Sequence, residues 1–234
     1  MGNFVVTFFL FYLAFSSVQA KFQEVERPKP KPKPKYQYEY FQMVQQWPQS
    51  ICNSEHCIGK PKAMFTIHGL WPQNYSTSLI CNGSQLADEY IKSIREQLNL
   101  YWPTLLFKDN KSFWNHEWMI HGECSDPPFN PFQYFQKTLK IRKTYDLLAI
   151  LNAAGLGPTT AALRNRDDIE KAIGAAIGQK PVLKCNTNTR TRDRQLSEVV
   201  LCLDEDGVKL IDCAKFVSTN CPLTFSWPPF VASE

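Results

Sequence analysis

The chain has 234 residues, enough for one domain with a sizeable core, and a formal net charge of +4. Five positive side chains lie between residues 27 and 35, and residues 36–234 are neutral overall, so bulk charge does not indicate a nucleic-acid-binding surface on the globular part. Eight cysteines, an even number, all lie downstream of residue 50. In a secreted chain such a count is typical of a disulfide-bonded framework.

The first twenty residues predict a secretory signal peptide. An uncharged apolar run from Phe4 to Phe15 is followed by Val18-Gln19-Ala20, which places small residues where signal peptidase cleaves. The run is short for a membrane span of about 20 residues, so an N-terminal membrane anchor is the weaker interpretation. We expect cleavage after Ala20, an extracellular or vacuolar protein, and no membrane segment in the mature form. Three sequons, which support the secretory route, begin at Asn74, Asn82 and Asn110.

Residues 21–37 are expected to form an extended arm. Its segment RPKPKPKPK (27–35) alternates proline and lysine, and proline fixes φ and removes backbone donors, so the backbone is polyproline-like and solvated. We favour a spacer over an electrostatic tether for RNA, cell wall or an acidic protein. The folded domain is then expected to span residues 38–234.

The first half of this domain shows two strand patterns and one helix pattern. A strand is expected over FQMVQQWP (41–48), closed by Trp47-Pro48, and a second over AMFTIHGLWP (63–72), running into a turn. Apolar residues at helical spacing, preceded by two acids, predict a helix over 88–102.

The second half adds helices and a hairpin. Helical spacing predicts a long helix over 132–155, ending at Gly155, and another over 166–178. Strands are expected at 198–203 and 208–213, because an Asp-Gly turn separates them. Cys202 and Cys213 should face each other across this hairpin. The fold class is therefore α+β, with several helices packed on a mainly antiparallel sheet.

The segment FWNHEWMIHGEC (113–124) resembles the zinc-protease pattern H-E-x-x-H, but its histidines, His116 and His121, are five residues apart. Ligands in the zinc pattern are four apart, which is about 40° around a helix, whereas a spacing of five gives about 140°. Cys124 is no ligand if it is oxidised. We therefore expect no metal and no other cofactor.

An acid–base site is the better interpretation of the same segment. On an ideal helix, with about 100° per residue, one arc carries His116, Ile120, Glu117 and His121 in angular order, while Trp118 and Met119 lie on the side suited to a core. Two histidines and a carboxylate on one arc suit proton transfer near pH 5–7. The alternative is that they are capping or core histidines.

A second candidate segment is FTIHGLWPQNY (65–75). His68 lies where a predicted strand enters a turn, a common place for catalytic side chains, and Trp71 offers a flat face that could stack a base. A buried tryptophan in a turn is the alternative. Three histidines and a carboxylate suit metal-free RNA cleavage, in which a neutral imidazole deprotonates the 2′-OH and an imidazolium protonates the departing 5′-oxygen. DNA lacks the 2′-OH, so it should not be cleaved.

The two segments FTIHGLWP and FWNHEWxxHGxC resemble, in order and spacing, the active-site segments of the ribonuclease T2 family. The resemblance extends over about residues 38–225 and is strongest to plant members, the pistil S-ribonucleases of self-incompatibility and the S-like enzymes. It implies a secreted, monomeric endoribonuclease that cleaves single-stranded RNA through 2′,3′-cyclic phosphates to 3′-phosphates. An S-ribonuclease would also have an F-box-type recognition partner. The sequence pI of 8.6 leans slightly toward that group.

The resemblance also implies roles for individual residues. His68 corresponds to the general acid, His121 to the general base, His116 to a phosphate-binding histidine and Glu117 to a glutamate that supports the transition state. Base-binding positions correspond to Trp71, Gln46 and Phe113. The implied disulfides are Cys52–Cys57, Cys81–Cys124, Cys185–Cys221 and Cys202–Cys213.

One position departs from the family pattern. The family usually has lysine directly before the second histidine, and this chain has Ile120. Lysine would donate a charge-assisted hydrogen bond to a phosphate oxygen, so its loss is expected to lower the rate by about 10²–10³-fold. It should also raise the histidine pKa values relative to a lysine-containing enzyme. The sequence thus predicts a weak ribonuclease, with a catalytically impaired RNA-binding or recognition protein as the alternative.

Overall fold

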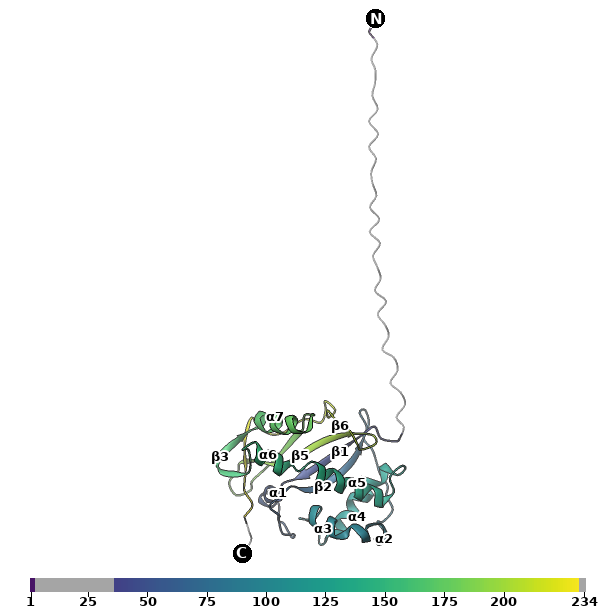
Figure 1. The fold of residues 1–234 in the computed structure, drawn as a ribbon, viewed down its shortest axis with the longest axis vertical. Helices are drawn as coiled ribbons and strands as arrows, with labels where there is room; N and C mark the ends of the chain where they lie inside the picture. The colour runs from purple at the N-terminus through teal and green to yellow at the C-terminus, as the bar shows by residue number, and fades with distance from the viewer. Residues whose placement is uncertain (3–35, 232–234) are drawn as a thin grey trace. The chain divides into compact units, whose positions relative to one another are not determined.

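The computed structural model describes residues 1–2 and 36–231, and Figure 1 shows the folded part. The predicted signal peptide, and the arm up to residue 35, lie outside the described residues apart from Met1 and Gly2. The strands are β1 (Tyr40–Gln46), β2 (Thr66–Gln73), β3 (Thr159–Asn165), β4 (Val182–Thr187), β5 (Arg194–Asp204), β6 (Leu210–Ile211) and β7 (Thr224–Trp227). The helices are α1 (Pro48–Ser54), α2 (Asp88–Ile91), η1 (Lys92–Ile94), α3 (Arg95–Tyr101), α4 (Asn110–Ile120), η2 (Gly122–Ser125), α5 (Pro131–Thr144), α6 (Leu147–Ala153) and α7 (Arg166–Ile177).

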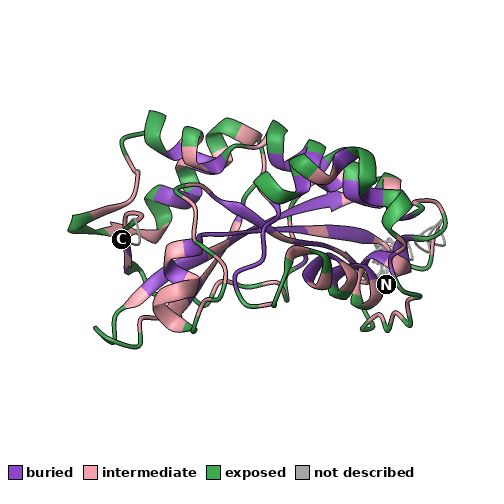
Figure 2. Cartoon of the chain, turned by 90° about the horizontal axis from the view of Figure 1, so that it is seen from below, coloured by how far each residue is buried: buried purple, intermediate pink, exposed green. Residues whose placement is uncertain are grey.

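The strands of residues 36–231 form one sheet in the order β2-β1-β5-β7-β3, with β4 and β6 also paired to β5. All pairs are antiparallel except β5 with β7, so the predicted α+β class with a mainly antiparallel sheet is confirmed. Strand β1 pairs on both edges and is buried at six of its seven residues. Figure 2 shows buried residues along the strands and on the helix sides toward them, the pattern of helices packed on a sheet.

The β1–β2 pair contains a bulge that places a candidate catalytic residue. Val44 is opposite Gly69 and Gln45 is opposite Ile67, so His68 is the extra residue of the bulge. The strand predicted over 63–72 is confirmed as β2, but the predicted position of His68 at a strand end is wrong, since β2 continues to Gln73. A bulge redirects one side chain without ending the strand, which explains how His68 can face the site from within the sheet.

The predicted helix over 88–102 is interrupted. Its apolar residues Ile91, Ile94 and Leu98 are buried as expected, but the chain passes from α2 through the 3₁₀ turn η1 into α3. A 3₁₀ turn has three residues per turn, so it keeps Ile91 and Ile94 on the same face. The apolar spacing therefore reports the buried face correctly and misses the tighter winding.

The predicted helix over 132–155 is two helices. The carboxylate of Asp146 accepts a hydrogen bond from the backbone N–H of Ala149 at 3.2 Å and caps α6, while α5 ends before Tyr145. Capping by aspartate competes with continuation of the helix, and the apolar pattern carries no sign of it. Helix α7 agrees with its prediction to within one residue and is capped by Gly178, whose φ of 78° suits glycine. The longest helix of the described part, α5, has 14 residues, and none of the helices there is long and apolar enough to span a bilayer.

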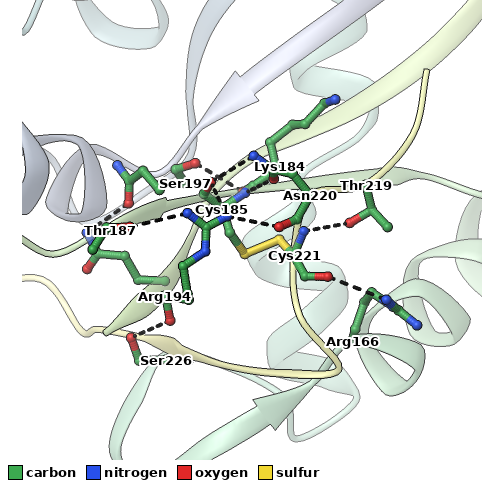
Figure 3. The surroundings of a disulfide bond; sticks show 12 residues. Arg166, Lys184, Cys185, Thr187, Arg194, Ser197, Thr219, Asn220, Cys221 and Ser226 are labelled. Atoms are coloured by element: carbon green, nitrogen blue, oxygen red, sulfur yellow. Dashed lines mark hydrogen bonds between the residues drawn. A yellow bond between two sulfur atoms is a disulfide. The ribbon is translucent and has the colours of Figure 1, made fainter. Parts of the chain in front are cut away.

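All four disulfides implied by the resemblance are present. In the hairpin, Cys202 pairs in register with Ile211, and Cys213 reaches it from just beyond β6. Figure 3 shows the surroundings of the Cys185–Cys221 disulfide, where the Arg194 guanidinium donates to the Cys185 carbonyl at 3.0 Å and the Asn220 carbonyl at 2.9 Å. The disulfide and these hydrogen bonds fasten β4, β5 and the chain before β7 together.

Candidate active site

Helix α4 carries most of the candidate segment FWNHEWMIHGEC (113–124). The Asp109 carboxylate accepts a hydrogen bond from the Ser112 N–H at 2.7 Å and starts the helix. Trp114 and Trp118 are buried, and the Trp114 indole donates to the Trp102 carbonyl at 2.7 Å. With that face fixed in the core, Glu117 is also buried, at 2% exposure. The predicted core position of Trp118 is confirmed.

His121 lies just past the end of α4. Its φ of −131° and ψ of −55° are not helical, although its N–H still donates to the Glu117 carbonyl at 3.1 Å. The ideal-helix angle predicted for His121 therefore does not hold, because the helix ends one residue earlier. The Cys81–Cys124 disulfide lies three residues further on and ties this turn to the loop before α2.

Three of the predicted catalytic residues gather around Trp71. The Trp71 ring lies 5.1 Å from the His68 ring in an edge-on arrangement and 5.0 Å from the His121 ring, measured between centroids. Its indole N–H donates to Glu117 Oε2 at 3.0 Å. The fourth residue, His116, is exposed and packs on Phe107 at 5.1 Å. The fold thus joins the two histidine segments through one tryptophan.

A carboxylate that sequence reasoning missed completes this cluster. Glu198, on β5, lies with Oε1 2.6 Å from His68 Nδ1. The residue opens the predicted strand EVVLCL, and nothing in that run distinguishes it from an ordinary strand glutamate. The pairing of β1 with both β2 and β5 brings it beside His68.

The two histidines have opposite pKa shifts. Burial lowers the pKa of His68, but the hydrogen bond and charge of Glu198 and the charge of Glu117 outweigh it, so the pKa ends above 6.5. Burial, and then the charges of His68 and His116, lower the pKa of His121 to about 4. Near pH 5–6 His68 is therefore protonated and His121 is neutral.

Glu117 is unusual for a carboxylic acid. Burial raises its pKa to about 7, against the lowering effect of the His68 charge and the Trp71 hydrogen bond, and the charge of Glu198 adds to the increase. Below that pH Glu117 is largely a neutral acid that can donate a hydrogen bond. Perturbed groups gathered in this way are typical of a catalytic centre.

A cavity of about 520 Å³ opens beside the cluster. Its lining includes His68, Trp71 and Glu198 together with the two weaker base-site candidates, Gln46 and Phe113. Phe107, which the sequence did not single out, also lines it and stacks on Phe113 at 5.2 Å between centroids. The site therefore combines proton-transfer groups with an aromatic wall.

The three sequon asparagines differ in their surroundings. Asn82 is exposed and Asn74 is half-buried, with its amide donating to the Gln37 carbonyl at 3.2 Å. Asn110 begins α4, and its side chain both accepts from the Thr104 N–H at 2.8 Å and donates to Asn99 at 2.7 Å. Asn82 is thus the most accessible of the three.

Gly69 allows the close approach at the centre of the site, and a Cβ there would collide with the Trp71 indole nitrogen and with Glu117 Oε2. The variant Gly69→Ala is expected to lose about 10²-fold in kcat/KM for RNA, because displacing these groups misplaces the catalytic geometry. Steady-state kinetics on a dinucleoside phosphate measure the loss of activity, and thermal unfolding measures the loss of stability. The loss of stability should be about 1–3 kcal/mol.

Gly174→Ala is the matched control, because a Cβ in α7 would meet its nearest neighbour, the Gln179 carbonyl, at an ordinary 3.6 Å. This variant should retain activity and gain about 0.5–1 kcal/mol, since glycine is unfavourable inside a helix. Full activity in Gly69→Ala would show that the Trp71–Glu117 contact is not needed.

Comparison with known proteins agrees with this site. The model of the ribonuclease T2 family matches residues 38–213. Ribonuclease MC of Momordica charantia is 39% identical over 180 residues, 75% of this chain and 94% of the relative. The extracellular ribonuclease LE of Solanum lycopersicum is 34% identical over 201 residues, 81% of this chain and 86% of the relative. A crystal structure of RNase NT in complex with 5′-AMP has a TM-score of 0.76 at 33% identity, covering 82% of this chain and 99% of that one. The chain therefore belongs to the ribonuclease T2 family and is a T2-type endoribonuclease of the plant branch.

Proposed function

We propose that this enzyme cleaves single-stranded RNA without a metal, with His121 as general base and His68 as general acid. The observation that carries the proposal is the pair of histidines in contact with one tryptophan, one with a raised and the other with a lowered pKa. A neutral base and a protonated acid are the dominant combination over a broad pH range when the two pKa values are separated in this sense.

The reaction then has two steps. His121 takes the 2′-OH proton, the 2′-oxygen attacks phosphorus, and the bond from phosphorus to the 5′-oxygen breaks as His68 gives that oxygen a proton. The products are a 2′,3′-cyclic phosphate and a 5′-hydroxyl. In the second step the roles reverse, and water opens the cyclic phosphate to a 3′-phosphate.

Glu117 and His116 are proposed to act on the phosphate. As a neutral acid below about pH 7, Glu117 can donate a hydrogen bond to a phosphate oxygen without repelling it. His116, exposed beside Phe107, is proposed to hold a phosphate. We propose that Trp71, Gln46 and Phe113, which line the cavity, contact RNA bases. The structurally similar RNase NT was crystallised with 5′-AMP, which supports nucleotide binding by this fold.

Digestion of a defined RNA by the purified mature chain tests the proposal. Cyclic phosphates should accumulate first and 3′-phosphates later, with the same rate in EDTA, and an all-deoxy strand should remain intact. Cleavage that stops in EDTA would support the zinc interpretation of His116 and His121. Cys124 cannot serve as a thiolate ligand in that case, because it is disulfide-bonded.

Activity should be restricted to acidic and neutral pH. His121 acts when neutral, so kcat/KM should rise as pH increases through about 4. His68 and Glu117 act when protonated, so it should fall as pH rises through their raised pKa values, about 7 for Glu117. A pH–rate profile on a dinucleoside phosphate measures both limbs. A rate that still increases above pH 8 would contradict this assignment of roles.

Secretion and the biological role are further parts of the proposal. Ribonuclease LE is named as extracellular, which supports secretion. A monomeric state, and a glycan first at Asn82, the most exposed of the three sequon asparagines, belong to the same proposal. A pistil self-incompatibility role, with its F-box-type partner, would require expression in the style and loss of pollen rejection in a knock-out. The alternative, an impaired recognition protein, is motivated by Ile120 and would bind RNA without cleaving it.

A further inference from the structure

We propose that Glu198 is a positioning residue for the catalytic reaction, which orients the His68 imidazole and maintains it as the proton donor. The inference rests on the proposed role of His68 as general acid. Glu198 does not need to touch RNA in this role, because it acts through His68.

The geometry of the contact is specific. Glu198 Oε1 lies 2.6 Å from His68 Nδ1, which assigns the Nδ1 proton to this hydrogen bond and leaves Nε2 for the substrate. The His68 side chain is 34% exposed and that of Glu198 is 20% exposed, and both line the cavity, with the carboxylate the more buried of the two. The His68 carbonyl accepts from the Trp102 indole at 2.9 Å, which fixes the backbone at the bulge.

Glu198 is held rigidly. It pairs in register with Gln46 of β1 on one side and with Lys184 of β4 on the other. The adjacent Ser197 hydroxyl donates to the Lys184 carbonyl at 3.0 Å, and the Cys185–Cys221 disulfide follows directly on β4, as Figure 3 shows. A carboxylate on the inner part of a fastened sheet can keep a catalytic ring in one orientation.

The charges around His68 favour the imidazolium. The Glu198 carboxylate faces it from β5, and Glu117 on α4 adds a second negative charge only above its own pKa of about 7. His121, after α4, is neutral above its pKa of about 4 and does not oppose the imidazolium there. Lys184 neighbours Glu198 in the sheet, but its ammonium donates to the Ser218 carbonyl at 2.7 Å instead. The ion-pair partner of Glu198 is therefore His68 and not Lys184.

Two substrates separate this role from a merely structural one. A dinucleoside phosphate has a poor leaving group that needs a proton, whereas uridine 3′-(4-nitrophenyl phosphate) has a good leaving group that does not. Glu198→Ala should lower kcat on the dinucleoside about 10- to 100-fold and on the nitrophenyl ester less than about threefold, with KM little changed. Glu198→Gln keeps an acceptor but no charge, so it should move the alkaline limb about 1 pH unit lower. Glu198→Asp should restore part of the loss.

Two control variants, at Glu170 and at His68, separate failure of the positioning role from failure of the proposed acid role. Glu170→Gln removes another largely buried, ion-paired carboxylate, on α7, and should leave kcat unchanged on both substrates. His68→Ala should show the same preference for the nitrophenyl ester, and if it does not, the acid role itself is wrong. If His68→Ala behaves as expected while the Glu198 variants keep the wild-type limb and rate, the positioning role is overturned. Equal losses on both substrates would also overturn it. Above the pKa of His68, where the ring is neutral, NMR of the imidazole nitrogens should report the proton on Nδ1 in the wild type and a shift toward the Nε2–H tautomer in Glu198→Ala.

Discussion

Replacing His121 by alanine is expected to lower kcat/KM for RNA cleavage by about 10²–10⁴-fold, the usual contribution of a general base. The pKa of His121 is about 4, so it is the histidine of the pair that is neutral at working pH. Because the 2′-oxygen must be deprotonated whatever group departs, the loss should be the same for a dinucleoside phosphate and for uridine 3′-(4-nitrophenyl phosphate). That equality separates the base from the acid, whose loss depends on the leaving group.

His56 provides the matched control, because it is an exposed histidine just after α1 for which no catalytic role is expected. His56→Ala should retain the wild-type rate within about twofold, as surface substitutions usually do. Circular dichroism and thermal unfolding of both variants show that the fold is kept. A loss of less than tenfold in His121→Ala would contradict its assignment as the base.

Ile120→Lys is expected to increase kcat by about 10²–10³-fold, the value of one transition-state donor. Ile120 is the last residue of α4, 47% exposed and adjacent to His121. Among the described residues that line the cavity, Lys184 is the only lysine or arginine, and Ile120 is not one of the lining residues. A lysine at 120, adjacent to His121, would bring a cation that can donate a charge-assisted hydrogen bond to a phosphate oxygen. The substitution should not destabilise the fold, because a cation at a helix C-terminus is favourable by about 0.3–1 kcal/mol.

The same variant should shift the pH profile to lower values. A positive charge near His121 and His68 disfavours their protonated forms, so both limbs move to lower pH than in the wild type. Ile120→Met tests side-chain shape without charge and should give no increase. Leu163→Lys, on β3 and also exposed, adds the same charge elsewhere and tests whether one added positive charge increases the rate merely by attracting RNA.

The outcome at position 120 decides between the two functions considered for this chain. A wild type that cleaves slowly and improves with lysine is a weak enzyme. A wild type that binds RNA without cleavage, while Ile120→Lys cleaves, is an impaired recognition protein with an intact acid–base pair. An unchanged rate in Ile120→Lys would show that this site does not use a cation there.

Most helices and strands, and the residue types of the candidate site, could be predicted from the local sequence. Periodicity identified the buried faces of Ile91, Ile94 and Leu98, and the two histidine segments identified His68, His121 and Glu117, since side-chain spacing and residue type are local properties. Periodicity did not predict where the helix backbone changes within an apolar pattern, which happens at the 3₁₀ turn η1 and at the α6 cap Asp146. A capping carboxylate or a 3₁₀ turn leaves that pattern intact while changing the backbone.

The sequence by itself determined the disulfide-rich class, the α+β fold, the two histidine segments and the isoleucine at 120, and secretion stays a prediction. Only the tertiary structure decided which groups meet. It placed His68 at a bulge, set Trp71 against both histidines and brought Glu198 to His68 across 130 residues of chain. It also decided the protonation states, because pKa values depend on burial and on charges that only the folded chain brings together.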